Sequence, residues 1–160
     1  MKAVGIILIL VSSLLAGLAL ERESGKGARE LSSFISFVST LRTRLECYLE
    51  SPERVASGYS DVSLEKNGFL PALRGGKSLH ASYLTARGTL SIPKSADKTL
   101  DDLFSSFGKG YLANEMRATD GALNTLKGIL AEETKRADSR GRALKISAPA
   151  LGMGLVILLI

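Results

Sequence analysis

Residues 31–49 read LSSFISFVSTLRTRLECYL and decide the fold class. The spacing places the apolar side chains on one face of an α-helix, because they recur every three or four residues. These side chains are Leu31, Phe34, Ile35, Val38, Leu41, Leu45, Tyr48 and Leu49. We therefore expect a helix with one buried stripe, ended by the Ser51-Pro52 pair. Cys47 lies in the same helix and is expected to be a small buried hydrophobic side chain.

A second, longer helix is expected to begin near Tyr111. Its seam alternates steps of four and three residues, with one slip, over about three and a half heptads, which suits packing against another helix. The seam consists of Leu112, Met116, Thr119, Leu123, Leu126, Leu130, Thr134 and Ala137. The stripe on residues 31–49 is the expected partner, in an antiparallel pair; a helix of a partner protein is the alternative. The candidate packing or interface residues are Leu41, Leu45, Leu112, Met116, Leu123, Leu126 and Leu130.

Shorter helices are expected between these two. The expected segments are residues 52–59, 69–73, 79–86 and 100–107, the last started by Ser95 or Asp97. Glycines and turn residues separate them. The best candidate strand, residues 89–92, ends at Pro93, and no other stretch alternates convincingly. The predicted fold class is therefore an all-α helical bundle.

Both ends of the sequence are apolar. Residues 3–20 read AVGIILILVSSLLAGLAL, and a helix of this length nearly matches the thickness of the hydrocarbon core of a bilayer. Residues 146–160 read ISAPALGMGLVILLI, which would form a shorter helix without a polar face. We expect a transmembrane helix at each end. A cleaved signal peptide is the alternative for the first run and a buried core helix for the second.

The expected domains are therefore an N-terminal transmembrane helix (1–20), a soluble helical domain (21–145) and a C-terminal transmembrane helix (146–160). Within the soluble domain, residues 21–30 (ERESGKGARE) are expected to be a short linker, because they are charged and contain two glycines.

Charge supports this arrangement and gives it an orientation. The formal net charge is +5, but most basic residues alternate with acidic ones and no nucleic-acid-binding signature occurs, so we expect no nucleic-acid partner. The exception is a basic cluster just before the final apolar run, formed by Lys135, Arg136, Arg140, Arg142 and Lys145. Positive residues stay on the cytoplasmic side of membrane helices and meet anionic headgroups. The middle domain is therefore expected in the cytoplasm, against a lipid membrane.

No arrangement of residues points to catalysis or to a metal. Cys47 is the only cysteine and His80 the only histidine, and neither has a partner at metal-ligand spacing. Residues 75–78 (GGKS) superficially resemble a phosphate loop, but the first glycine of that motif is missing and no strand is expected before it. We expect neither an enzyme nor a cofactor-binding protein.

Three short motifs, in their order and spacing, resemble the stage III sporulation protein AB family. They are residues 41–48 (LRTRLECY) followed by Pro52, residues 107–112 (FGKGYL) and residues 151–160 (LGMGLVILLI). Two positions depart from the family pattern. Arg44 precedes Leu45 where members tend to carry an acidic residue, and residues 114–115 (NE) lie in the region where a glutamine is often seen.

The resemblance implies a structural role. Members of the family are similar to the cytoplasmic domain of the inner-membrane platform protein of type II secretion and type IV pilus systems. The chain would then be a non-enzymatic scaffold in a secretion or channel complex between mother cell and forespore. It would lie in the mother-cell membrane around the forespore, with other subunits, including a secretion-type ATPase, as partners. A generic membrane-tethered adaptor or a secreted helical protein are the alternatives, and homo-oligomer formation is left open.

Overall fold

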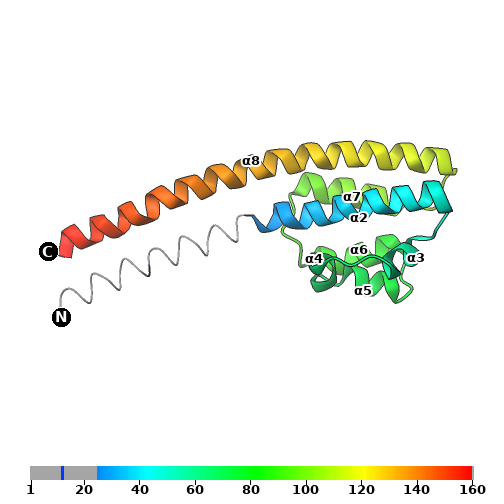
Figure 1. Ribbon diagram of the computed structural model, residues 1–160, viewed down its shortest axis with the longest axis horizontal. Helices are drawn as coiled ribbons and strands as arrows, with labels where there is room; N and C mark the ends of the chain where they lie inside the picture. The colour runs from blue at the N-terminus through cyan, green and yellow to red at the C-terminus, as the bar shows by residue number, and fades with distance from the viewer. Residues whose placement is uncertain (1–11, 13–24, 160) are drawn as a thin grey trace. The chain divides into compact units, whose positions relative to one another are not determined.

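The computed structural model describes Ser12 and residues 25–159, with side chains up to Ser139 (Figure 1). Every regular element among these residues is an α-helix, so the predicted all-α class is confirmed. The chain divides into two units, Gly27–Glu132 and a second formed by Met1–Lys26 with Glu133–Ile160.

The helices follow the predicted order closely. They are α2 (Lys26–Tyr48), α3 (Pro52–Ser57), α4 (Val62–Lys66), α5 (Phe69–Arg74), α6 (Leu79–Arg87), α7 (Lys94–Ser106) and α8 (Leu112–Leu159). Helix α4 was not expected. It is little more than one turn, and the Asp61 side chain caps its start by accepting hydrogen bonds from the backbone N–H groups of Ser63 and Leu64.

The expected linker over residues 21–30 is too long, because α2 already begins at Lys26. Glu30 is buried, and its carboxylate accepts a hydrogen bond of 2.6 Å from the backbone N–H of Ser91. Gly27 approaches the same loop, so that a Cβ there would lie 2.4 Å from the carbonyl oxygen of Ser91. The first turn of α2 is therefore ordered by tertiary contact with the segment between α6 and α7.

Helix α7 also begins earlier than expected. It starts at Lys94, directly after Pro93, whose φ of −61° suits the residue before a helix. It ends at Ser106, and Phe107 has an extended backbone. Residues 100–106 of the predicted segment are thus the second half of a 13-residue helix, and Phe107 lies beyond its end.

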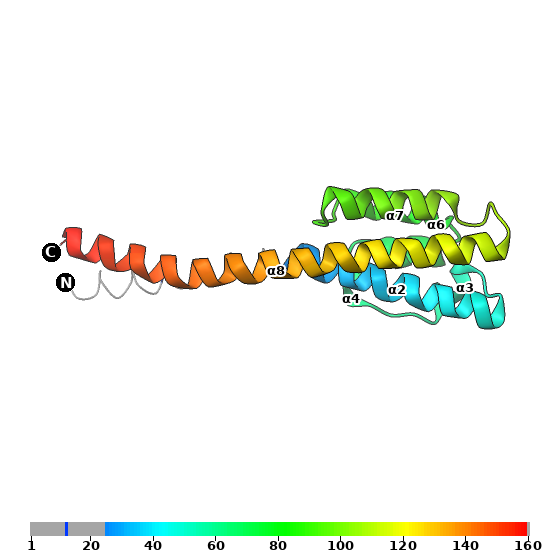
Figure 2. The same cartoon turned by 90° about the horizontal axis from the view of Figure 1, so that it is seen from above.

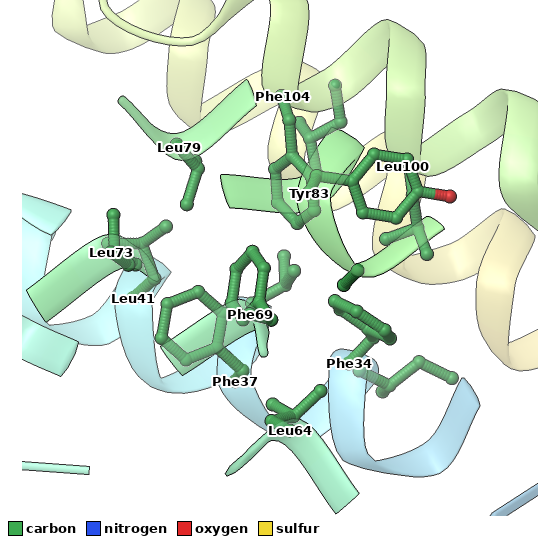
Figure 3. Close-up of a cluster of buried hydrophobic side chains, with 14 of the residues drawn as sticks. Phe34, Phe37, Leu41, Leu64, Phe69, Leu73, Leu79, Tyr83, Leu100 and Phe104 are labelled. Carbon is green, nitrogen blue, oxygen red and sulfur yellow. The ribbon is translucent and has the colours of Figure 1, made fainter. Parts of the chain in front are cut away.

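Aromatic side chains form the centre of the core (Figure 3). Phe34 of α2 packs edge-on against Phe69 of α5 and Tyr83 of α6, with ring centroids 5.2 and 5.8 Å apart. Phe104 of α7 stacks on Phe69 at 5.8 Å. Such pairs stabilise by about 0.5–1.5 kcal/mol each beyond the area they bury. Four helices therefore meet at one aromatic cluster, and fully buried leucines surround it: Leu31, Leu41, Leu64, Leu70, Leu73 and Leu100.

Helix α2 and the first part of α8 run antiparallel, side by side in both views of the molecule (Figures 1 and 2). Arg42 and Asp120 join them, with 2.8 Å between Nε and Oδ1. Within unit Gly27–Glu132, the chain therefore enters and leaves at the same end. The opposite end carries the last turn of α2 and the first turn of α8, and we call it the distal end.

Among the described residues, no helix has both the length and the apolar content that crossing a membrane requires. The expected N-terminal span, residues 3–20, lies outside the described residues apart from Ser12. Residues 146–159 are helical and continue α8, and their side chains lie outside the described part of the chain.

Candidate interaction surface

The expected packing or interface residues of the stripe and the seam lie at different depths in the fold. Leu41, Leu123 and Leu126 are buried in the core. The half-buried members of the set are Leu45, Met116 and Leu130. Leu112, at 39% exposure, is open to solvent. Within the described unit, the middle of the seam thus packs against the chain's own core, and only its first residue is open to another molecule.

The distal end exposes four large apolar side chains. Tyr48 and Leu49 at the end of α2 are 69% and 70% exposed, and Tyr111 and Leu112 at the start of α8 are 85% and 39% exposed. They lie at one level, because Tyr48 lies about two helical turns beyond Arg42, and Leu112 about two turns before Asp120, the partner of Arg42. We call these four residues the distal apolar patch.

The sequence pattern placed Tyr48 and Leu49 in the buried stripe, and the structure shows that this is wrong. Cys47 was likewise expected to be buried and is exposed. Helical spacing identifies the apolar face correctly, but no other helix covers the last turn of α2. The sequence did indicate that Tyr48 and Leu49 lie at the end of the helix, because they come just before Pro52, where the helix has to stop.

Leu49 has an unusual backbone. Its φ is +52°, the single left-handed non-glycine residue among those the structure describes. Its N–H bonds to the carbonyl of Leu45 at 3.1 Å and closes the last turn of α2. Glycine or asparagine is normally preferred at this position, and a branched residue there costs about 1–2 kcal/mol. Neither the local backbone nor burial accounts for a leucine here.

A cavity of about 250 Å³ lies next to Tyr111. Its walls combine the apolar side chains of Leu103, Phe107 and Ala118 with the polar residues Ser106, Lys109, Asn114 and Glu115, and Gly110 completes them. Glu115 accepts a hydrogen bond from the N–H of Gly110 and so holds the loop before α8 in place. A second cavity, of about 300 Å³, shares three of these residues and continues between α7 and α8.

Charged side chains of both signs surround the distal apolar patch. On the α2 side, Arg44 pairs with Glu50 at 3.4 Å, and Arg42 pairs with Glu46 in addition to Asp120. The hydrogen bond to Asp120 raises the pKa of Arg42. On the α8 side, Lys109 and Arg117 are exposed. The rim of the patch is therefore mixed in charge rather than uniformly acidic or basic.

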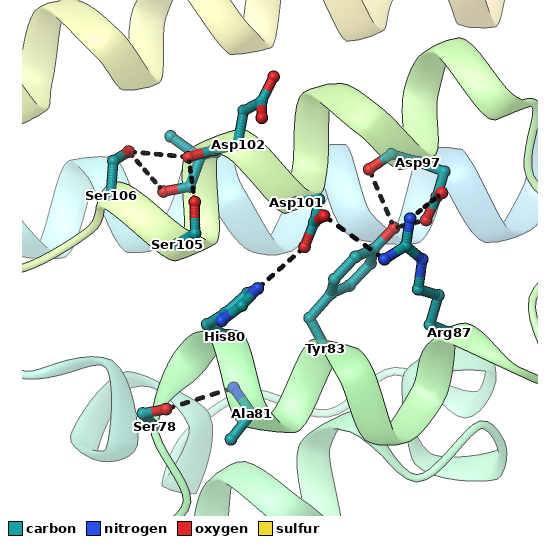
Figure 4. Close-up of polar contacts among 11 residues, drawn as sticks. Ser78, His80, Ala81, Tyr83, Arg87, Asp97, Asp101, Asp102, Ser105 and Ser106 are labelled. Carbon is teal, nitrogen blue, oxygen red and sulfur yellow. Dashed lines mark hydrogen bonds and ion pairs between the residues drawn. The ribbon is translucent and has the colours of Figure 1, made fainter.

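A polar network joins α6 to α7 (Figure 4). Arg87 binds Asp97 at 2.6 Å and Asp101 at 3.4 Å, and His80 Nε2 lies 2.9 Å from Asp101. The hydroxyl of Tyr83 donates to Asp97 at 2.6 Å. Burial, reinforced by this hydrogen bond, raises the pKa of Tyr83. Burial alone would raise the pKa of Asp97 too, but the hydrogen bonds from Arg87 and Tyr83 outweigh it and lower that pKa.

This network fastens two helices, and His80 contributes to it through Asp101. Each of its five side chains, His80, Tyr83, Arg87, Asp97 and Asp101, has a partner within the network. No group of three or more His, Cys, Asp or Glu side chains suited to a metal occurs among the described residues.

The basic cluster of the sequence lies along α8. Lys135 and Arg136 are exposed, and Arg136 pairs with Glu133 at 3.0 Å. Arg140, Arg142 and Lys145 follow in the same helix, and their side chains lie outside the described residues.

No protein-family model, curated protein or solved structure matches this chain.

Proposed function

We propose that this chain is a non-enzymatic, membrane-anchored helical platform in a secretion or channel complex between the mother cell and forespore of endospore-forming bacteria. The observation that carries the proposal is the antiparallel packing of α2 and α8, through which the chain enters and leaves unit Gly27–Glu132 at one end. A unit with both connections at one end is suited to attachment to a surface from that end. Its sides and its distal end then stay available to other subunits.

The flanking sequences supply the attachment in this proposal. Residues 3–20 and 146–160 are uncharged and apolar, and each acts as a transmembrane helix. The basic cluster that begins at Lys135 lies at the cytoplasmic headgroups. The helical unit is then cytoplasmic, in the mother cell. The resemblance to the stage III sporulation protein AB family supports the membership of a sporulation complex, with a secretion-type ATPase among the partners.

The proposal is tested with two strains of a spore-forming host. One strain lacks the chemically versatile side chains, and the other has a C-terminal segment that cannot insert into the membrane. One strain carries Cys47→Ala and His80→Gln together, which removes both chemically versatile side chains. The glutamine can still donate a hydrogen bond to Asp101, so α6 and α7 stay joined. A platform needs neither group, so this strain should form spores at the normal frequency.

The second strain replaces residues 155–159 by alternating Ser and Asp. An aspartate in a membrane helix costs up to ~2.5–3.5 kcal/mol, and the change also removes five apolar residues, so this segment could no longer insert. We expect sporulation to arrest after engulfment. If the Cys47/His80 variant is folded and membrane-bound but fails to sporulate, the scaffold role is wrong. Normal sporulation of the second strain would show that the function does not need membrane insertion of this segment, and the membrane-platform role would be wrong.

Orientation has its own test, because the exposed Cys47 is the only thiol in the sequence. A membrane-impermeant maleimide should leave Cys47 unmodified in intact cells and modify it after the cells are lysed. A Cys47→Ser chain provides the background. Modification in intact cells would overturn the cytoplasmic placement.

A further inference from the structure

We draw no further inference here: the strongest candidate, the groove that two adjoining cavities form between the side chains of α7 and α8, has walls of mixed apolar, acidic and basic character, and nothing in the structure shows what covers it.

Discussion

Replacement of Leu126 by alanine tests whether α8 is part of the core of unit Gly27–Glu132. Leu126 is fully buried in the core cluster. Removing three carbons there loses their transfer free energy and leaves a cavity, which together cost ~2–5 kcal/mol for a buried leucine. Alanine has a slightly better helix propensity than leucine, which offsets only a small part of this loss. The free energy of unfolding should therefore fall by about 2–4 kcal/mol.

The matched control is Leu84→Ala in α6. It makes the same chemical change within a helix, but Leu84 is 47% exposed and leaves no enclosed cavity. Its cost should be under ~1 kcal/mol, because surface substitutions are mild. For a unit of this size, ~1 kcal/mol corresponds to roughly 4 °C or more, so Leu126→Ala should lower Tm by at least about 8 °C.

The assay is thermal unfolding of the detergent-solubilised full chain, followed by far-ultraviolet circular dichroism. Equal shifts for the two variants would refute the reasoning, since they would mean that Leu126 is no more buried than Leu84. An unchanged Tm for Leu126→Ala, combined with loss of binding to a partner, would show that the seam faces another protein instead.

Three further predictions concern stability. Gly128→Ala should raise Tm by a few degrees in the same assay, because the site is in mid-helix, a Cβ meets nothing within 4 Å, and glycine costs ~1 kcal/mol relative to alanine there. Gly27→Ala should lower Tm despite the same change in propensity, because its Cβ would lie 2.4 Å from the Ser91 carbonyl oxygen. The raised pKa of Tyr83 means that its contribution to stability is complete below the ordinary value of 10.0 and is lost as the pH rises above it, so Tm should fall more steeply above pH 10 for the natural chain than for Tyr83→Phe.

Periodicity was sufficient to predict most of the helices. Local spacing along the sequence determines three of these features: the stripe on residues 31–49, the breaks at glycines and the long final helix. The antiparallel pairing of α2 with α8 was also predictable, because both helices are long and each carries one apolar face. The five-residue helix α4 was missed since a single capped turn has too little periodic signal, although Asp61 is a suitable cap.

What spacing could not predict is how far the neighbouring elements reach. The start of α2 depends on a bond between Glu30 and the backbone of Ser91, 61 residues away in the sequence. At the other end, Tyr48 and Leu49 continue the apolar face beyond the last helix that covers it. Both errors have the same physical origin, because the length of a buried face is set by tertiary packing and only its direction by local sequence. Because of this error, Tyr48 and Leu49 were predicted to be buried although they belong to the candidate interaction surface.

The pairing of α2 with α8 has a consequence for the chain during its synthesis. Arg42 and Asp120 meet across 78 residues of sequence. At about 5–20 residues per second, a ribosome needs several seconds to make that length. Throughout this interval the groove that later receives Leu123 and Leu126 is uncovered. Near its end, once Phe104 of α7 has been made, the aromatic cluster of α2, α5, α6 and α7 can assemble before α8 is available. The nascent chain therefore passes through a stage in which a nearly complete core lacks its closing helix, and this stage is the one most open to chaperones and to aggregation.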